Sequence, residues 1–167
     1  GLDLAEKLLG QRPTGMWPAE GAVSQEVLGM FAKEGVKWIA TGEHVLSKSL
    51  EIPTFKRNTD GIVTNPEVLY TPWYGQLNRQ DDVAIFFRDL SISDQVGFTY
   101  SGMSPEMAVA DMMKALEAAR EVSVTMDRPL VVSIVLDGEN AWEHYQNDGI
   151  DFLSLRSEER FSRNAET

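Results

Sequence analysis

Residues 83–88 are Val-Ala-Ile-Phe-Phe-Arg, and Asp89 follows them directly. Successive rather than alternate positions of this run are apolar, which is typical of a strand in a sheet that is covered on both faces. Residues 36–41 (VKWIAT) form a second run rich in strand-forming residues, and residues 129–136 (PLVVSIVL) form a third. Residues 15–18 (GMWP) are a short strand end or loop before them, and together these runs predict strands of a parallel sheet.

Helical patterns separate these runs. Residues 24–34 place apolar side chains at helical spacing after an N-cap serine, and Gly35 follows at the position of a left-handed cap. Ser104-Pro105-Glu106 is a second helix start, with a buried stripe over about four turns behind it. The alternation of strands and helices predicts an α/β fold. Further helices are expected over residues 2–10 and 140–148, and after Gly149.

The segment between the first two predicted strands has a different character. Residues 42–81 contain three prolines and several isolated aromatic residues, and we expect a long irregular loop there. Loops of this length are unusual in compact domains and are often either functional or disordered.

Composition and charge exclude several classes of function. The chain has 167 residues, with 15 Lys and Arg against 26 Asp and Glu, so its net charge is −11. This charge argues against binding to nucleic acids and to anionic membrane surfaces, because both need clustered cations. The sequence contains no cysteine, which excludes disulfides, thiolate zinc sites and a cysteine nucleophile.

No segment has the features of a membrane span or a leader. The longest apolar run, residues 130–136, is about a third of the roughly 20 residues that cross a bilayer. No basic and then apolar leader opens the sequence, which favours the cytoplasm as its location.

Polar clusters stand where the predicted strands end, which is where α/β folds place their sites. The carboxylates there indicate a neutral, polyhydroxylated or cationic ligand. A phosphate ligand is disfavoured, because no glycine-rich phosphate loop is present. The clusters are residues 17–20 (WPAE), residues 41–44 (TGEH), Arg88-Asp89 with Asp94, and residues 137–140 (DGEN).

The same residues also have simpler structural explanations. Glu20 fits an acid that stabilises the dipole of the helix after it, and Asp137, before a glycine, fits a β-turn. Asp89 and Asp94 fit ion-pair partners of Arg88 that cap a loop.

The histidines argue against a metal site, and the tryptophans have two possible roles. His44 and His144 are far apart in the sequence, and neither has a second histidine three or four residues away, so we expect no metal and no cofactor. Trp17 and Trp142 fit either core packing or the aromatic faces on which sugar rings lie.

Four motifs in order give the sequence a specific resemblance. They are residues 15–20 (GMWPAE), 37–41 (KWIAT), 87–98 (FRDLSISDQVGF) and 136–143 (LDGENAWE). Together they resemble glycoside hydrolase family 57, which includes retaining α-glucan-active amylopullulanases, α-amylases, branching enzymes and glucanotransferases. The resemblance implies that Glu20 is the catalytic nucleophile, in a Trp-x-x-Glu motif, and that Asp137 is the general acid/base, in an Asp-Gly-Glu motif.

The resemblance also implies an architecture. The family's catalytic domain is an incomplete barrel of seven strands, and its earlier motifs, one with His-Gln-Pro, do not occur in residues 1–167. We therefore expect residues 1–167 to be a single domain, the central-to-C-terminal part of a (β/α)7 TIM-like barrel. Uncovered barrel edges then favour self-association. The sequence departs from the family at Gly42, where relatives often carry an acid, and at Leu90, where a histidine is frequent.

The chemistry of retaining glycosidases agrees with these roles. Such an enzyme needs two carboxyl groups roughly 5–5.5 Å apart, one ionised to attack and one protonated to donate. Glu20 and Asp137 follow separate predicted strands, which fits one cleft between them. An α-glucan or oligosaccharide is the expected substrate. The further residues expected to bind it are Trp17, Glu43, His44, Arg88, Asp89, Asp94, Glu139 and Trp142.

Two other functions remain open at this stage. A metal-dependent hydrolase similar to polysaccharide deacetylases needs two histidines and an aspartate around a divalent ion. A non-catalytic carbohydrate-binding fragment keeps the family's sequence without turnover.

Overall fold

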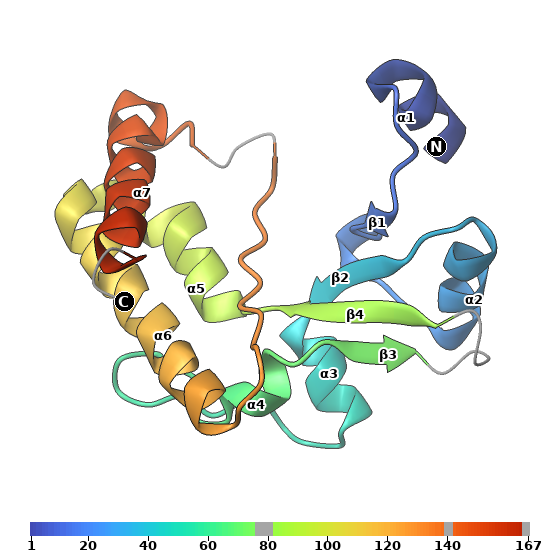
Figure 1. Ribbon diagram of the computed structural model, residues 1–167, viewed down its shortest axis with the longest axis horizontal. Coiled ribbons are helices and arrows are strands. Elements are labelled where there is room, and N and C mark those ends of the chain that lie inside the picture. The colour runs from blue at the N-terminus through green and yellow to red at the C-terminus, as the bar shows by residue number, and fades with distance from the viewer. Residues whose placement is uncertain (76–81, 139–141, 165–167) are drawn as a thin grey trace.

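The computed structural model describes residues 1–75, 82–138 and 142–164, and a four-stranded sheet lies at its centre (Figure 1). The strand order is β1-β2-β4-β3. β1, β2 and β4 run parallel, as predicted, and β3 is antiparallel to β4. The chain therefore has a mixed α/β fold with a mostly parallel sheet. The strands are β1 (Gly15–Met16), β2 (Trp38–Gly42), β3 (Trp73–Gly75) and β4 (Val83–Arg88).

The longer helices begin close to where the sequence predicts them. Ser24 accepts a hydrogen bond from the backbone N–H of Val27 and begins α2, and Ser104 begins α6 in the same way. The longer helices are α1 (Leu2–Leu9), α2 (Gln25–Lys33), α6 (Pro105–Thr125) and α7 (Ile150–Asn164). The shorter α-helices are α3 (Glu43–Ser49), α4 (Pro66–Leu69) and α5 (Leu90–Asp94). Single turns of other helix types are η1 (Ala19–Gly21), η2 (Gln95–Thr99), η3 (Tyr100–Gly102) and η4 (Gln146–Gly149).

The helix expected over residues 140–148 is wrong in its described part. Residues 142–149 form turns that end in η4. Asn147, Asp148 and Gly149 have φ angles of 53°, 51° and 75°, and three consecutive left-handed residues cannot continue a right-handed helix. α7 starts directly after them, as expected after Gly149.

The prediction of an irregular loop over residues 42–81 holds for residues 50–65 and 70–72, which form no helix or strand, and is wrong where α3, α4 and β3 form. Residues 76–81 lie outside the described part. The isolated aromatic and aliphatic residues of this segment anchor it: Phe55, Val63 and Tyr70 are buried in one cluster with Phe87 of β4. These contacts join residues distant in sequence, so local periodicity does not reveal them.

The strand expected over residues 129–136 is the third correction. The segment is extended, but it pairs with β4 only through a parallel bridge between Arg88 and Ser133. β3 already occupies the first half of that edge of β4, where Trp73 pairs with Ile85. The segment therefore passes only the carboxyl end of β4 (Figure 1).

The two faces of the sheet differ in their cover. Ile39 and Val83 are fully buried against α2, and Phe87 packs against α3. On the other face Trp38 remains 43% exposed, and its ring meets that of Phe86 edge-on. Trp38, Phe86 and residues 131–135 border an apolar groove of about 380 Å³. Among the described helices, α2 and α3 thus cover one face of the sheet. None of the described helices has the length and apolar character needed to cross a bilayer.

Candidate active site

A pocket of about 620 Å³ opens at the carboxyl ends of the parallel strands. Its walls are formed by residues at or just after the ends of β1, β2 and β4, and by the end of the extended segment 129–136. Its lining consists of Trp17, Glu20, Gly42, Glu43, His44, Arg88, Leu90, Asp94, Phe98, Val135, Leu136, Asp137 and Gly138. Seven of these thirteen residues were expected as site residues: Trp17, Glu20, Glu43, His44, Arg88, Asp94 and Asp137.

Glu20 reaches the pocket from a strained turn after β1. Its φ of 54° and ψ of 22° are left-handed, a conformation that costs a non-glycine residue about 1–2 kcal/mol. The turn is held from two sides. Thr41 of β2 donates a hydrogen bond of 2.5 Å to the carbonyl of Gly21, and the Trp17 ring covers Gly21. Strain that the surroundings enforce in this way is common at active sites.

Asp137 lies at the same pocket, directly after the extended segment 129–136. It is exposed, and the two residues before it line the pocket with it. Two contacts fix the approach of this segment: Arg88 Nε donates to the carbonyl of Val135 at 2.8 Å, and the N–H of Val135 donates to Ser93 Oγ at 3.2 Å. Glu139 lies outside the described residues.

Arg88 and Asp89 take different sides of the sheet, because successive residues of a strand alternate between its faces. Arg88 lines the pocket and pairs with Asp94 at 2.9 Å, one of the two ion pairs expected for it. Asp89 is fully buried, lies behind the pocket wall and pairs with Arg57 instead of Arg88. Its structural interpretation was the cap of a loop, whereas it caps the helix α5 by accepting from the N–H of Ile92 at 3.0 Å.

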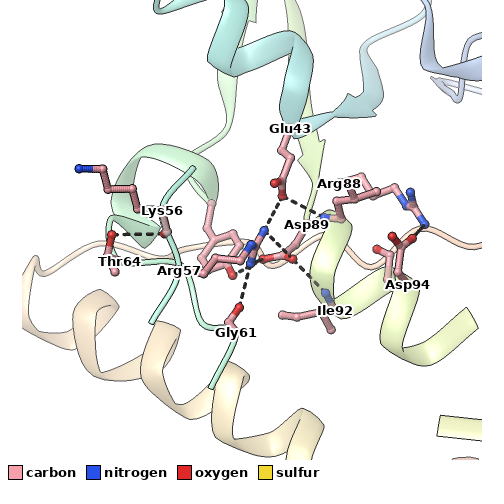
Figure 2. A network of polar contacts seen from close by, with 12 residues as sticks. Glu43, Lys56, Arg57, Gly61, Thr64, Arg88, Asp89, Ile92 and Asp94 are labelled. Carbon is pink, nitrogen blue, oxygen red and sulfur yellow. Dashed lines mark hydrogen bonds and ion pairs between the residues drawn. The ribbon is translucent and has the colours of Figure 1, made fainter. Parts of the chain in front are cut away.

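Arg57 is the centre of a buried polar network (Figure 2). Its Nη2 lies 2.6 Å from Glu43 Oε2 and 3.1 Å from Asp89 Oδ1. The register of the sheet explains why the two carboxylates lie close together. Gly42 pairs with Arg88, so Glu43 and Asp89 follow at the same level after neighbouring strands. Two adjacent carboxylates need a cation between them. The network therefore ties the ends of β2 and β4 together behind the pocket.

Further hydrogen bonds complete this network. Glu43 also accepts from the N–H of Leu90 at 2.9 Å, and the hydroxyl of Tyr70 donates to Asp89 at 2.6 Å. Burial and, after it, the charge of Asp89 raise the pKa of Tyr70, so its phenol stays protonated. Burial acts to lower the pKa of Arg57, but Asp89 and Glu43 outweigh it and raise that pKa.

Sequence reasoning missed Arg57 and Tyr70. Both lie in the segment expected to be an irregular loop, and neither belongs to a motif. Tyr70 carries a weak signal as one of several closely spaced aromatic residues. Arg57 carries none, because its partners are 14 and 32 residues away.

Trp142 and His144 lie away from the pocket. The ring of Trp142 packs on Tyr145 and Phe152, with centroids 5.3 and 6.2 Å apart, which is one of its two expected environments. His144 is exposed and lies 3.3 Å from the Glu143 carboxylate. In the part of the chain that the structure describes, no three His, Cys, Asp or Glu side chains are grouped as a metal site requires.

A pocket lined by carboxylates at the carboxyl ends of parallel strands is where α/β folds place enzyme sites. The family profile of glycosyl hydrolase family 57 matches residues 2–167, and the chain belongs to this family. The resemblance of the four motifs is thereby confirmed, and the chain is a glycoside hydrolase of a family that acts on glucans. None of the curated proteins compared with the chain matches it.

Proposed function

We propose that the chain supplies the two carboxylates of a retaining α-glucan hydrolase or transglycosylase, with Glu20 as nucleophile and Asp137 as general acid/base. One observation carries this proposal: the two side chains come from separate elements and line the same pocket. The family adds support, because its members act on glucans.

The proposed reaction has two displacement steps. In the first, the Glu20 carboxylate attacks the anomeric carbon while Asp137 gives its proton to the departing glycosidic oxygen. A glycosyl ester on Glu20 forms as the glycosidic bond breaks. In the second, the Asp137 carboxylate takes a proton from water or an acceptor hydroxyl, whose oxygen attacks the anomeric carbon and releases Glu20.

The other pocket residues suit substrate binding. Trp17 is 44% exposed, so its ring offers a face to a sugar. Arg88 is held by Asp94 and by the carbonyl of Val135, so its position is fixed before substrate arrives. Glu43 has one oxygen engaged by Arg57 and Leu90, and its other oxygen is the one available to a sugar hydroxyl.

We also propose that residues 1–167 form a single unit of a larger (β/α)7 barrel. The open apolar face around Trp38 and Phe86 supports this, because a barrel buries such a face inside. The same face would favour self-association of the chain alone, which sedimentation velocity at several concentrations measures. Kinetic experiments are therefore best done on the full-length protein that contains the chain.

Trapping the covalent intermediate tests the proposed roles. α-Maltosyl fluoride needs little acid catalysis to leave, so an Asp137→Asn variant should still be glycosylated by it but deglycosylated slowly. Intact mass spectrometry should then show an added maltosyl group, and peptide mapping should place it on Glu20. The matched control is the double variant with Glu20→Gln, which should carry no adduct. An adduct on another side chain would overturn the assignment of the nucleophile.

A further inference from the structure

Gly42, at the end of β2, has a backbone that any residue can adopt. Its φ of −81° and ψ of 149° are ordinary extended values. The conformational freedom of glycine therefore does not explain its presence at this position.

The neighbouring side chain explains it. A Cβ atom added to Gly42 would lie 2.4 Å from Cε1 and 2.5 Å from Nδ1 of His44. Both distances are far below van der Waals contact, so the imidazole occupies the space that a side chain at position 42 would take. Gly42 and His44 both line the pocket, and the ring is thus part of its wall.

The polar groups of this ring are unused within the described part of the chain. The backbone carbonyl of His44 accepts a hydrogen bond from the Ser47 hydroxyl, and among the described residues neither ring nitrogen of His44 has a hydrogen-bond or ion-pair partner. Glu43 and Arg88, its charged neighbours in the pocket, are by contrast engaged by Arg57 and Asp94. A neutral imidazole offers one donor and one acceptor, the pair that a sugar hydroxyl complements.

We propose that Gly42 is a positioning residue, which by lacking a side chain seats the His44 imidazole in the pocket wall, where the ring binds a hydroxyl group of the glucan. The choice of ligand rests on the function proposed above. The seating of the ring does not, because it follows from the contact between the two residues.

Histidine NMR separates these two parts. The 167-residue chain has only two histidines, so its imidazole C–H signals come from His44 and His144. The signals that disappear in a His144→Ala variant belong to His144. Without ligand, Gly42→Ala should shift the His44 signals and leave those of His144 in place. Gly102→Ala is the matched control, since a Cβ there meets nothing within 4 Å. Unchanged His44 signals in Gly42→Ala would overturn the seating of the ring.

Maltotriose is the probe for the second part. In the unmodified chain it should shift the His44 signals and the Trp17 indole signal, and leave His144 in place. Shifts at Trp17 without any at His44 would overturn the binding role of the ring. No shift at any residue would contradict glucan binding itself and with it the proposed function, while the ligand-free spectra would still decide the seating of the ring.

A double-variant cycle completes the test. His44→Ala and Gly42→Ala should each weaken maltotriose binding about three- to tenfold, the range expected for one hydrogen bond. Adding Gly42→Ala to His44→Ala should cause no further loss, because the ring that the methyl group displaces is already absent. Losses that multiply in the double variant would contradict the proposal.

Discussion

Arg57 Nη2 lies 2.6 Å from Glu43 Oε2, so a side chain behind the pocket wall is bonded directly to one that lines the pocket. The same guanidinium reaches Asp89, which is fully buried. Through this contact the long segment after β2 determines the geometry of the strand ends. It also makes the stability of the fold and the shape of the pocket depend on one arginine.

Removal of Arg57 should therefore destabilise the chain strongly. Arg57→Ala leaves two carboxylates buried without their cation, and we expect a loss of about 3 kcal/mol in the free energy of unfolding by urea. Arg120→Ala is the matched control: it removes an exposed ion pair with Glu117 and should cost less than about 1 kcal/mol. Equal losses for the two variants would show that the network does not hold the strand ends together.

Thr41 should matter for the position of Glu20. Its side chain is fully buried, and its hydroxyl holds the carbonyl of Gly21 in the strained turn. Thr41→Val keeps the shape but removes the donor, so we expect a loss of about 1–3 kcal/mol in stability.

The same substitution should lower kcat more than it raises KM, because the turn carries the proposed nucleophile. Thr125→Val is the control, since the Thr125 hydroxyl bonds the carbonyl of Glu121 in the exposed last turn of α6. An unchanged kcat in Thr41→Val would show that the bond does not position Glu20.

Stability should fall at high pH because of buried phenols. Burial raises the pKa of Tyr145 to about 12, and burial also raises that of Tyr70. An unfolded tyrosine ionises near pH 10. Below that pH both states keep the proton, so the ionisation of the phenols favours neither state. Above it the unfolded chain alone releases protons, so stability falls by up to about 1.4 kcal/mol per pH unit for each phenol.

Urea unfolding between pH 8 and 11.5 measures this slope. Tyr145→Phe should lower stability below pH 10, since the hydroxyl bonds the carbonyl of Val96, and its slope above pH 10 should be shallower. An unchanged slope would mean that Tyr145 does not contribute to the alkaline transition.

Local sequence signals predicted the elements whose stability is decided locally. The strands over residues 36–41 and 83–88 and the helices after Ser24 and Ser104 are confirmed, because apolar runs and cap residues act within a few positions. The pocket residues Glu20 and Asp137 were predictable for a similar reason: they belong to motifs that follow strand-like runs.

The failures are non-local. Residues 129–136 have the composition of a strand, but β3 takes the edge of β4 that they would have paired with. Arg88 and Asp89 stand side by side at the end of the same apolar run, so the sequence predicts the same site for both. The alternation of faces and the ion pair with the distant Arg57 place Asp89 behind the pocket. No sequence pattern near Asp89 predicts that its ion-pair partner, Arg57, lies 32 residues away.

Chelation separates the proposed mechanism from a metal-dependent one. A reaction carried by Glu20 and Asp137 needs no divalent ion, so activity of the full-length protein should survive dialysis against EDTA. Loss of activity that zinc or magnesium restores would favour the deacetylase-like alternative.

The configuration of products formed with azide tests the central claim most directly. With α-maltosyl fluoride as substrate, Asp137→Ala keeps the nucleophile, and azide attacks the glycosyl-enzyme in place of water. The product should be the α-maltosyl azide, with retained configuration. In Glu20→Ala azide should occupy the site of the missing carboxylate and attack the substrate directly, which gives the β-azide with inverted configuration. Proton NMR of the anomeric coupling distinguishes the two. Products of the same configuration from both variants, or turnover near that of the unmodified enzyme without azide, would contradict the two-carboxylate mechanism.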